Sequence, residues 1–581
     1  MSAKKRNDRA SRAKKDRSKN RVVTQRKKSV VRAEVLGRVK AKKAFEKRDW
    51  PTALKLLSPA WEQDPSDPDI VTVMGYILGK MGHRSRAIEV IERAISSDGL
   101  TPDLVGVISY LALDMELFEI GEKVCRIGME LAPDALENYV NYAHCLSAQD
   151  KLDEAVDFLQ GAIPLFADNA SIWNVLGTVV MLRDGPDVAE VFYQEALRLN
   201  PRDVKVLNNL ALSRGRQCRG EESLEISKRI VEIDSKAPEP RVGLATSYFG
   251  AGNMKEGWAN YRYRLDASRS SDQVARYLID CPQWDGEPIK GKTVLMAAEQ
   301  GLGDEMFFSR VYPHILGLGA NLIISCQVRL VSIYKRCFPQ CFVTSYKDVL
   351  REGFRYRVFP ELHAAMKAGE IQVDYYAPTA GAGEFIWQTK EDLKRPKDPV
   401  ISADPELAAS FKDRLDAISR KPRIGLAWTS GNRASSRIIH YLTLDDFGPL
   451  WGIKDQVEFI NLQYTDVASE LSQLKANKGV EIHRFDDVDL KQDIEANLAI
   501  MENCDVVISV GSAPLMFAAM SGRPTIACTW GVPWYAFSYT GKLPVAKDLI
   551  IMGANPDRSW SQNMELIVDE VVERLSLEQP S

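Results

Sequence analysis

Three carboxylates and two glycines lie within seven residues near the middle of the chain. The segment EQGLGDE (299–305) follows a β-rich apolar run and precedes a helical pattern. A carboxylate at such a turn could serve as a general base that removes a proton from a substrate hydroxyl. We predict this role for Asp304, with Glu299 or Glu305 as alternatives, while a helix N-cap is the competing interpretation of Asp304. Gly301 and Gly303 predict tight backbone geometry and close approach of a ligand.

A second set of candidate ligand-binding residues lies at or after three strand-like runs in the last third of the chain. These residues are Trp428, Ser430, Arg437, Tyr441, Gln463, Tyr464, Gly511, Ser512 and Ala513. The turn 511–513 opens a helix predicted over 512–521, whose first backbone N–H groups could hold an anion without any side-chain charge. Each of these residues also has a purely structural interpretation. Ser512 could simply cap the helix, Arg437 could be a solvated loop residue, and Trp428 or Tyr441 could belong to the hydrophobic core.

No metal or cofactor site is predicted. Asp486, Asp487, Asp489 and Asp493 lack the regular spacing of an oxygen-ligand loop, and the six histidines form no HExxH pattern.

Two sets of strands alternating with helices must position these residues. The first set is predicted at 292–298, 320–326 and 341–344, and the second at 423–428, 458–464, 480–483, 505–510 and 525–528. Strand, glycine turn and helix is the opening of an α/β unit. Ligands bind beyond the carboxyl ends of the strands in such folds, so we expect the site in a cleft between two lobes joined near 395–421.

The first half of the chain carries a 34-residue repeat of small residues. The repeated position is occupied by Ala41, Gly75, Ser109, Ala143, Gly177, Ala211 and Ala245. Twelve residues after each stands a second small residue, namely Ala53, Ala87, Gly121, Ala155, Ala189, Ser223 and Gly257. This spacing is that of the tetratricopeptide repeat (TPR), in which paired helices cross closely. About seven repeats predict a superhelix whose groove binds a peptide or a protein surface.

Charge and cysteine content narrow the possible compartments and partners. Residues 1–32 hold 14 Lys and Arg against two Asp, although the net charge of the whole chain is −3. We predict that this segment is a disordered tail, with contact to nucleic acid or an anionic membrane as the alternative. No aromatic residue is interleaved among its charges to stack on bases, so nucleic-acid binding is not the predicted function. Nine scattered cysteines without a CxxC pair favour a reduced, cytoplasmic location. No apolar run predicts a transmembrane segment or a signal peptide.

Several motifs together resemble those of bacterial TPR-glycosyltransferases. The resemblance covers residues 35 to about 560 and rests on WDGEPIKGKTVLMAAEQGLGDEMFFSRVYPHI (284–315), LAWTSGN (426–432), NLQY (461–464), DLKQDI (489–494) and ISVGSAPLMFAAMSGRP (508–524). It implies a metal-independent GT-B fold of two lobes, distantly similar to heptosyltransferases and O-GlcNAc transferases. It also implies transfer of a sugar from a CMP- or UDP-linked donor to a protein acceptor held by the repeats. Some members act on flagellin with nonulosonic acids.

Charge, the 34-residue repeat and the strand pattern set the expected segments, and the resemblance identifies the two lobes as GT-B lobes with an acceptor side and a donor side. The expected segments are a basic tail (1–32), a TPR solenoid (33–266), a connector (267–290), and GT-B lobes over 291–400 and 421–575. Asp304 is the expected base, in an acceptor-side loop with Glu299, Gln300, Gly301 and Gly303. The second set of candidates given above then forms the donor side.

The chain departs from the heptosyltransferase pattern at one place. Those enzymes carry an Asp and a His where this sequence has Gly511 and Met516, so a different donor is expected. Two other functions remain open. One is transfer to a saccharide or lipid-linked acceptor, and the other is a non-catalytic scaffold whose transferase half has decayed.

Overall fold

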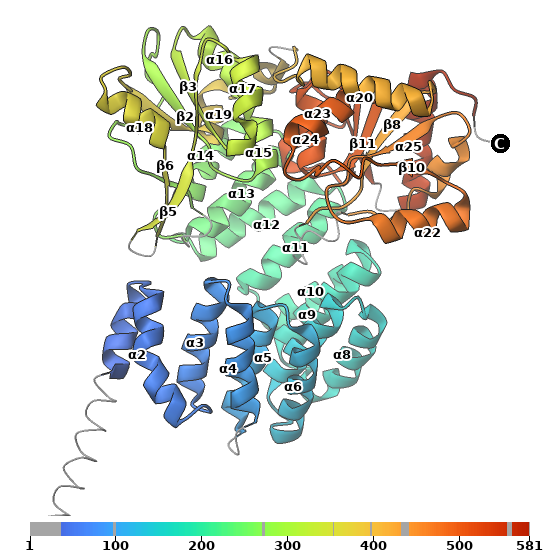
Figure 1. Cartoon of the computed structure of the whole chain (residues 1–581). Coiled ribbons are helices and arrows are strands. Elements are labelled where there is room, and N and C mark those ends of the chain that lie inside the picture. The colour runs from blue at the N-terminus through green and yellow to red at the C-terminus, as the bar shows by residue number, and fades with distance from the viewer. Residues whose placement is uncertain are drawn as a thin grey trace, which may run out of the picture. The chain divides into compact units, whose positions relative to one another are not determined.

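The computed structural model describes residues 37–96, 100–269, 274–351, 354–394, 398–431, 441–554 and 560–579 (Figure 1). The predicted basic tail over 1–32 therefore lies outside the described residues. The chain divides into two compact units, Met1–Val175 with Arg351–Phe354 and Leu176–Leu350 with Arg355–Ser581. Because the division falls inside a repeat helix, the later repeats belong to the same unit as the sheets.

The first part of the chain is an unbroken succession of helices, which confirms the predicted TPR region. After a helical segment over 37–46, the helices are α2 (Trp50–Gln63), α3 (Pro68–Lys80), α4 (Arg84–Ile95), α5 (Pro102–Asp114), α6 (Phe118–Leu131), α7 (Leu136–Ala148) and α8 (Leu152–Phe166). The division between the units lies in α9 (Ala170–Arg183). The remaining repeat helices are α10 (Pro186–Leu199), α11 (Val204–Arg216), α12 (Gly220–Ile233), α13 (Pro238–Gly250) and α14 (Met254–Tyr261).

The small residues of the 34-residue period are buried where helices cross. A Cβ atom added to Gly75 would come within 2.5 Å of Leu111 Cδ1, and one added to Gly177 within 2.8 Å of Tyr193 Cε1. A larger side chain at Gly75 or Gly177 would have to displace its neighbour on the next helix, so the small residues of the period reflect the short distance between helices.

Caps and prolines set where the repeat helices begin. Asp67 and Asp203 each accept two backbone N–H bonds, at 2.9 to 3.2 Å, from the first turns of α3 and α11. Prolines stand in the first turn of α3, α5, α10 and α13, where a missing N–H costs no hydrogen bond.

Two mainly parallel sheets confirm the predicted α/β class of the later part of the chain. The first has the order β4-β3-β2-β7 and consists of β2 (Thr293–Ala297), β3 (Asn321–Cys326), β4 (Phe342–Ser345) and β7 (Tyr375–Pro378). The second has the order β10-β9-β8-β11-β12-β14-β13 and consists of β8 (Arg423–Ala427), β9 (Glu458–Asn461), β10 (Ile482–His483), β11 (Val506–Val510), β12 (Thr525–Trp530), β13 (Gly541–Leu543) and β14 (Leu549–Ala554). The edge strand β13 runs antiparallel to β14. A small third sheet contains β1 (Arg276–Tyr277), β5 (Lys347–Arg351) and β6 (Phe354–Val358).

Helices accompany both large sheets. Those of the first are α15 (Leu302–Phe308), α16 (Tyr312–Gly317), α17 (Val331–Cys337), α18 (Pro360–Lys367) and α19 (Gly383–Ile386). Those around the second are α20 (Pro405–Ile418), α22 (Ala468–Lys478), α23 (Ile494–Glu502), α24 (Ala513–Met520) and α25 (Trp560–Leu575). Every residue of β8 and β11 is buried, as expected for parallel strands covered on both faces.

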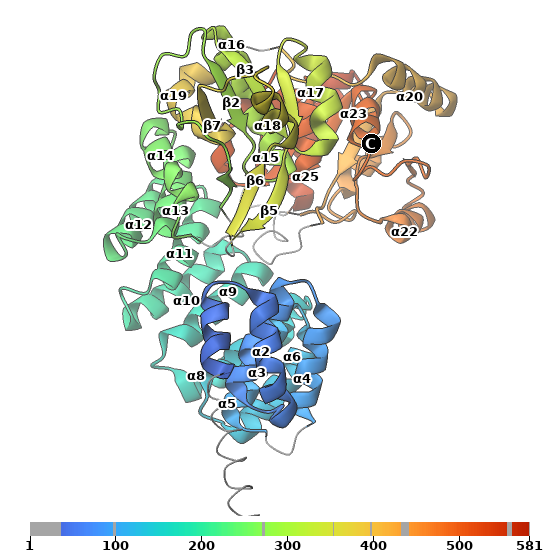
Figure 2. The ribbon, with the colours of Figure 1, turned by 60° about the vertical axis from the view of Figure 1, so that its left-hand side comes forward.

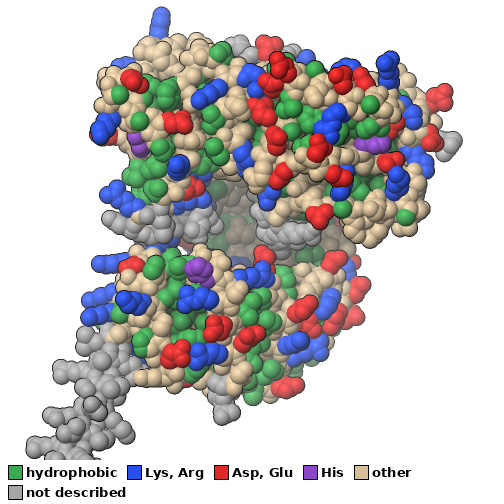
Figure 3. All heavy atoms as spheres, in the orientation of Figure 1, with side chains coloured by type: hydrophobic (Ala, Val, Ile, Leu, Met, Phe, Trp, Pro, Cys, Tyr) green, Lys and Arg blue, Asp and Glu red, His purple; other side chains and the backbone are tan. Residues whose placement is uncertain are grey.

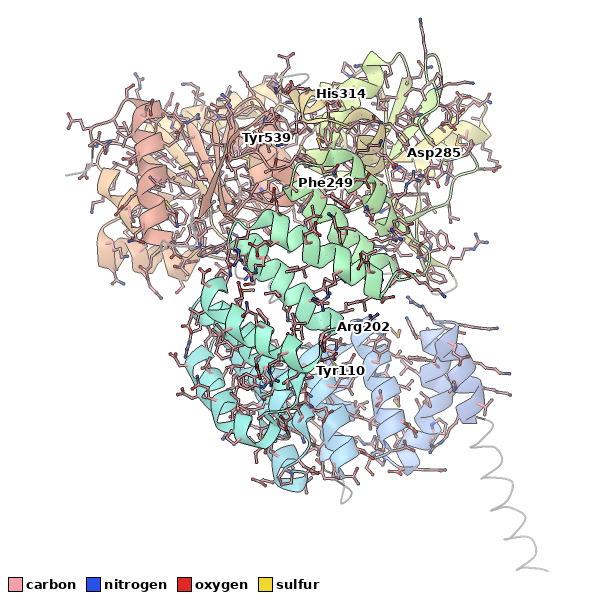
Figure 4. The ribbon with its side chains drawn as sticks, turned by 180° about the vertical axis from the view of Figure 1, so that it is seen from behind. Tyr110, Arg202, Phe249, Asp285, His314 and Tyr539 are labelled. Carbon is pink, nitrogen blue, oxygen red and sulfur yellow. The ribbon has the colours of Figure 1, made fainter. Side chains whose placement is uncertain are left out.

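The last repeat packs into the core of the α/β part. Phe249 (labelled in Figure 4) and Trp258 belong to one buried cluster with Trp387 and Phe537. The indole Nε1–H of Trp258 donates to the backbone oxygen of Trp387 at 2.7 Å, and Figure 2 shows α14 beside α19. The repeat pattern thus ends near residue 266, whereas the hydrophobic core continues across that point.

Among the described residues, no helix has both the length and the apolar character needed to span a membrane.

Candidate functional site

A cavity of about 1050 Å³ lies at the carboxyl ends of strands from both parallel sheets. Residues that follow β2, β3, β8, β9, β11 and β12 line it, and the repeat helices α11, α12 and α13 contribute a further wall. All of these elements belong to the second compact unit. The carboxyl ends of parallel strands are where α/β folds bind their ligands, so this cavity is the candidate site.

The cavity gathers residues from both predicted sides of the site. The predicted residues that line it are Gly301, Gly303, Asp304, Ser430, Tyr441, Tyr464, Gly511, Ser512 and Ala513. Those that do not line it are Glu299, Gln300, Trp428 and Gln463. Arg437 lies outside the described residues.

Asp304 lies in the first turn of α15, at the cavity wall. The N-cap of this helix is Gly301, not Asp304, and no side chain caps it. A Cβ atom on Gly303 would lie 3.4 Å from Ala513 Cα, so glycine lets the first turns of α15 and α24 approach each other. Asp304 therefore stands beside the turn at which we predict an anion to bind.

Glu299 and Gln300 connect the glycine-rich loop to the last repeat. Glu299 is 7% exposed and forms an ion pair with the buried Arg264, with 2.7 Å between Nη2 and Oε2. Its other oxygen accepts the backbone N–H of Ala380 at 2.7 Å. The side-chain amide of Gln300 donates to the hydroxyl of Tyr261 at 2.8 Å. These contacts give both residues a positioning role and leave Asp304 as the loop carboxylate at the cavity.

Glu305, the other alternative base, is buried away from the cavity lining. It accepts a hydrogen bond from the backbone N–H of Gln327 at 3.0 Å and one from the hydroxyl of Tyr346 at 2.8 Å. Burial is the main cause that raises the pKa of Glu305 from 4.5 to about 7. This side chain consequently takes up a proton near neutral pH.

Glu305 should make the stability of the protein depend on pH. Because the folded state holds the Glu305 proton more tightly than the unfolded state, its contribution is complete below pH 4.5 and is lost as pH rises through its folded-state pKa of about 7. At 1.36 kcal/mol per pKa unit, the loss is on the order of 3 kcal/mol. The Glu305→Gln side chain cannot ionise. We therefore expect the difference in free energy of unfolding between Glu305→Gln and the wild type, measured with urea, to shift in favour of the variant as pH rises from 5 to 8. A constant difference across this range would contradict the prediction.

The ends of β8 and β9 are linked by hydrogen bonds among the predicted donor-side residues. The hydroxyl groups of Ser430 and Tyr464 lie 2.6 Å apart at the cavity. Gln463 is buried, and its side-chain oxygen accepts the backbone N–H groups of Trp428 and Thr429 at 3.2 and 3.0 Å. Gln463 and Trp428 therefore support the strand ends from within the core.

The turn after β11 exposes backbone to the cavity at the start of α24. Ser512 occupies the N-cap position, but its hydroxyl makes no capping hydrogen bond and instead lies 3.3 Å from that of Ser509. A Cβ atom on Gly511 would lie 3.7 Å from the Tyr535 hydroxyl. Gly511 and Met516 both line the cavity without ionisable groups, so any anion held here depends on backbone N–H groups and on charges from other elements.

Several cavity residues were not among the sequence candidates. They include Arg216 of α11, Arg329 after β3, Lys491 before α23, Asn497 of α23, and Trp534 after β12. The signal for Trp534 was present, because it follows a predicted strand by a few residues. No comparable signal marked Arg216, whose position depends on how the repeats pack.

Comparisons with known proteins cover both parts of the chain. No family model matches it. Protein FlbA of Caulobacter vibrioides is 28% identical over 510 residues, which are 85% of this chain and 83% of that protein. Among solved structures, a thermophilic TPR protein of Thermus thermophilus is 20% identical, with a TM-score of 0.27 over 32% of this chain and 98% of that chain. A tetratricopeptide repeat protein of Parabacteroides merdae is 12% identical, with a TM-score of 0.33 over 42% of this chain and 95% of that chain. Neither the repeats nor the sheets alone make up 85% of the chain, so its similarity to FlbA spans both.

Proposed function

We propose that this chain is a glycosyltransferase that moves a sugar from a nucleotide-sugar donor to a polypeptide held by its repeats. The observation that carries the proposal is the composition of one cavity. Its wall combines Asp304, the strand ends of two parallel sheets and three repeat helices. Two such sheets agree with the GT-B arrangement that the sequence motifs imply.

The proposed reaction uses the two sides of the cavity differently. Asp304 accepts the proton of an acceptor hydroxyl, whose oxygen then forms the new bond to the anomeric carbon of the sugar. The bond between that carbon and the leaving phosphate oxygen breaks, and the nucleotide keeps the electron pair. Backbone N–H groups at the start of α24 stabilise the charge on the departing phosphate.

The donor and acceptor follow from the same resemblance. A CMP- or UDP-linked sugar is the proposed donor, and flagellin modified with a nonulosonic acid is the first acceptor and product to test. The repeat wall favours a polypeptide over a saccharide or lipid-linked acceptor, because α11, α12 and α13 supply much of the lining.

Intact mass spectrometry of the acceptor tests this function directly. Flagellin from cells with and without the protein should differ by the mass of one or more sugars. Purified protein, donor and acceptor should reproduce the same increment. Identical acceptor masses in both strains, together with no transfer in the purified system, would leave the scaffold function as the better account.

A substitution in α13 tests whether the acceptor lies along the repeats. Gly243 lines the cavity, and a Cβ atom there would meet no protein atom within 4 Å. Gly243→Leu should therefore fill acceptor space without harming the helix, since leucine favours helices over glycine. We expect acceptor affinity to fall by roughly tenfold, or about 1.4 kcal/mol, with the donor KM unchanged.

The matched control for this substitution is Gly106→Leu. Gly106 lies in α5, its Cβ position is also open, and it does not line the cavity. Equal acceptor affinities for the two variants would argue against a binding path along α13.

A further inference from the structure

Arg216 is a buried cation at the wall of the candidate site. It is the last residue of α11, is 8% exposed and lines the cavity. Within the described part of the chain, no carboxylate forms an ion pair with it, and its Nε atom has no hydrogen-bond partner. A buried charge normally has a partner, so this guanidinium is placed to receive one from a ligand.

Arg214, on the same helix, shows the contrasting arrangement. It is also buried, and its Nε atom likewise has no hydrogen-bond partner, but Glu190 and Glu222 both form ion pairs with it, the latter at 3.1 Å. For Arg216, burial is the leading influence and lowers its pKa to about 10, a value at which it keeps its charge at neutral pH. Carboxylates of the protein thus neutralise the charge of Arg214, whereas no described carboxylate pairs with Arg216.

The loop after β12 fixes Arg216 at the edge of the second sheet. Gly531 has a φ of +62°, which favours glycine, and a Cβ atom there would lie 3.2 Å from Gly215 O and 3.8 Å from Arg216 Cα. The last turn of α11 therefore lies directly against the carboxyl end of β12. This is the sheet edge at which ligands of α/β folds bind.

Charges around the cavity favour a negative ligand. Its described lining has three basic residues, Arg216, Arg329 and Lys491, against one acidic residue, Asp304. On the face shown in Figure 3, by contrast, basic and acidic side chains are interspersed over the α/β part. The cavity lining thus carries a positive excess that attracts an anion, and Arg216 is the one of its three basic residues that is buried.

We propose that Arg216 is an anion-binding residue contributed to this site by the repeat region. Its ligand is an oxyanion group, phosphate or carboxylate, of a molecule bound at the carboxyl ends of the two sheets. The identification of that molecule as a nucleotide sugar rests on the proposed function. Binding of the anion itself does not require transfer.

Calorimetric titration of the full chain with inorganic pyrophosphate, and separately with acetate, tests this role. A charge-assisted hydrogen bond of this kind corresponds to a roughly 10- to 100-fold effect on affinity, so Arg216→Gln should weaken anion binding by that factor. Arg216→Lys keeps the positive charge, so its affinity for the anion should fall less than that of Arg216→Gln. Arg214→Gln should keep the affinity of the wild type.

Thermal unfolding separates a ligand-binding arginine from a structural one. Arg214→Gln should lower the Tm, because it removes the ion pairs of the buried Arg214 with Glu222 and with the half-buried Glu190, which keeps only Arg219 as an ion-pair partner among the described residues. Arg216→Gln should keep or raise the Tm, because it removes a buried charge that the protein does not neutralise.

The outcomes are distinct. A response to pyrophosphate alone assigns a phosphate, and a response to acetate alone assigns a carboxylate. Three results would overturn the proposal: no binding of either anion, equal affinity for wild type and Arg216→Gln, or a loss of Tm in Arg216→Gln as large as in Arg214→Gln. Arg216-dependent binding in a protein that transfers no sugar would refute the proposed function and leave this inference standing.

Discussion

Asp304→Asn should lower the rate of sugar transfer by roughly 10²- to 10⁴-fold, the usual contribution of a positioned general base. The substitution keeps the size and the shape of the side chain but removes its negative charge and its basicity. The N-cap of α15 is Gly301, so the substitution leaves the N-cap residue unchanged. The measurement is the initial rate of transfer at saturating donor and acceptor, with the Tm of each variant as the test of folding.

Two further variants complete this experiment. Asp304→Ala should lose as much activity as Asp304→Asn if proton removal is the role of the side chain. Glu305→Gln should stay active, because Glu305 is buried with Gln327 and Tyr346 and does not line the cavity. Full activity in Asp304→Asn would require a different base.

Glu299→Ala should destabilise the protein by about 3–5 kcal/mol, because it leaves the guanidinium of Arg264 buried without its partner. It also removes the acceptor of the backbone N–H of Ala380. Urea unfolding of the full chain gives the free energy.

The matched control replaces both members of the pair. Arg264→Met combined with Glu299→Leu leaves no isolated charge, and such apolar replacements of buried pairs are often tolerated. We expect the double variant to recover most of the lost stability. A Glu299→Ala variant as stable as the wild type would show that the pair does not hold the loop to the last repeat.

The sequence predicted those features that are set by local geometry. Glycine at positions 75 and 177 marks a helix crossing that admits no larger side chain, so a period of 34 residues was enough to identify the repeats. Carboxyl ends of parallel strands meet at one sheet edge, so Asp304 and the turn 511–513 were expected in one site, and they line one cavity.

Features set by tertiary packing were not predictable in this way. Arg216 lies outside every strand-end motif, and it reaches the cavity at the place where α11 packs against Gly531. The contact between Glu299 and Arg264, which stands 35 residues earlier, also depends on how the last repeat packs against the glycine-rich loop. Trp428 and Gln463 also stand at strand ends, but they turn into the core rather than toward the cavity.

The aromatic junction between α14 and the α/β part has a consequence for synthesis on the ribosome. Trp258 is translated 129 residues before Trp387, to which it donates its hydrogen bond, and Phe537 follows another 150 residues later. At about 5–20 residues per second, the partners of Trp258 and Phe249 are complete only after roughly 14–56 s. During that interval the last repeat presents an uncovered aromatic face to the solvent around the ribosome, and such exposed apolar surfaces are what chaperones bind.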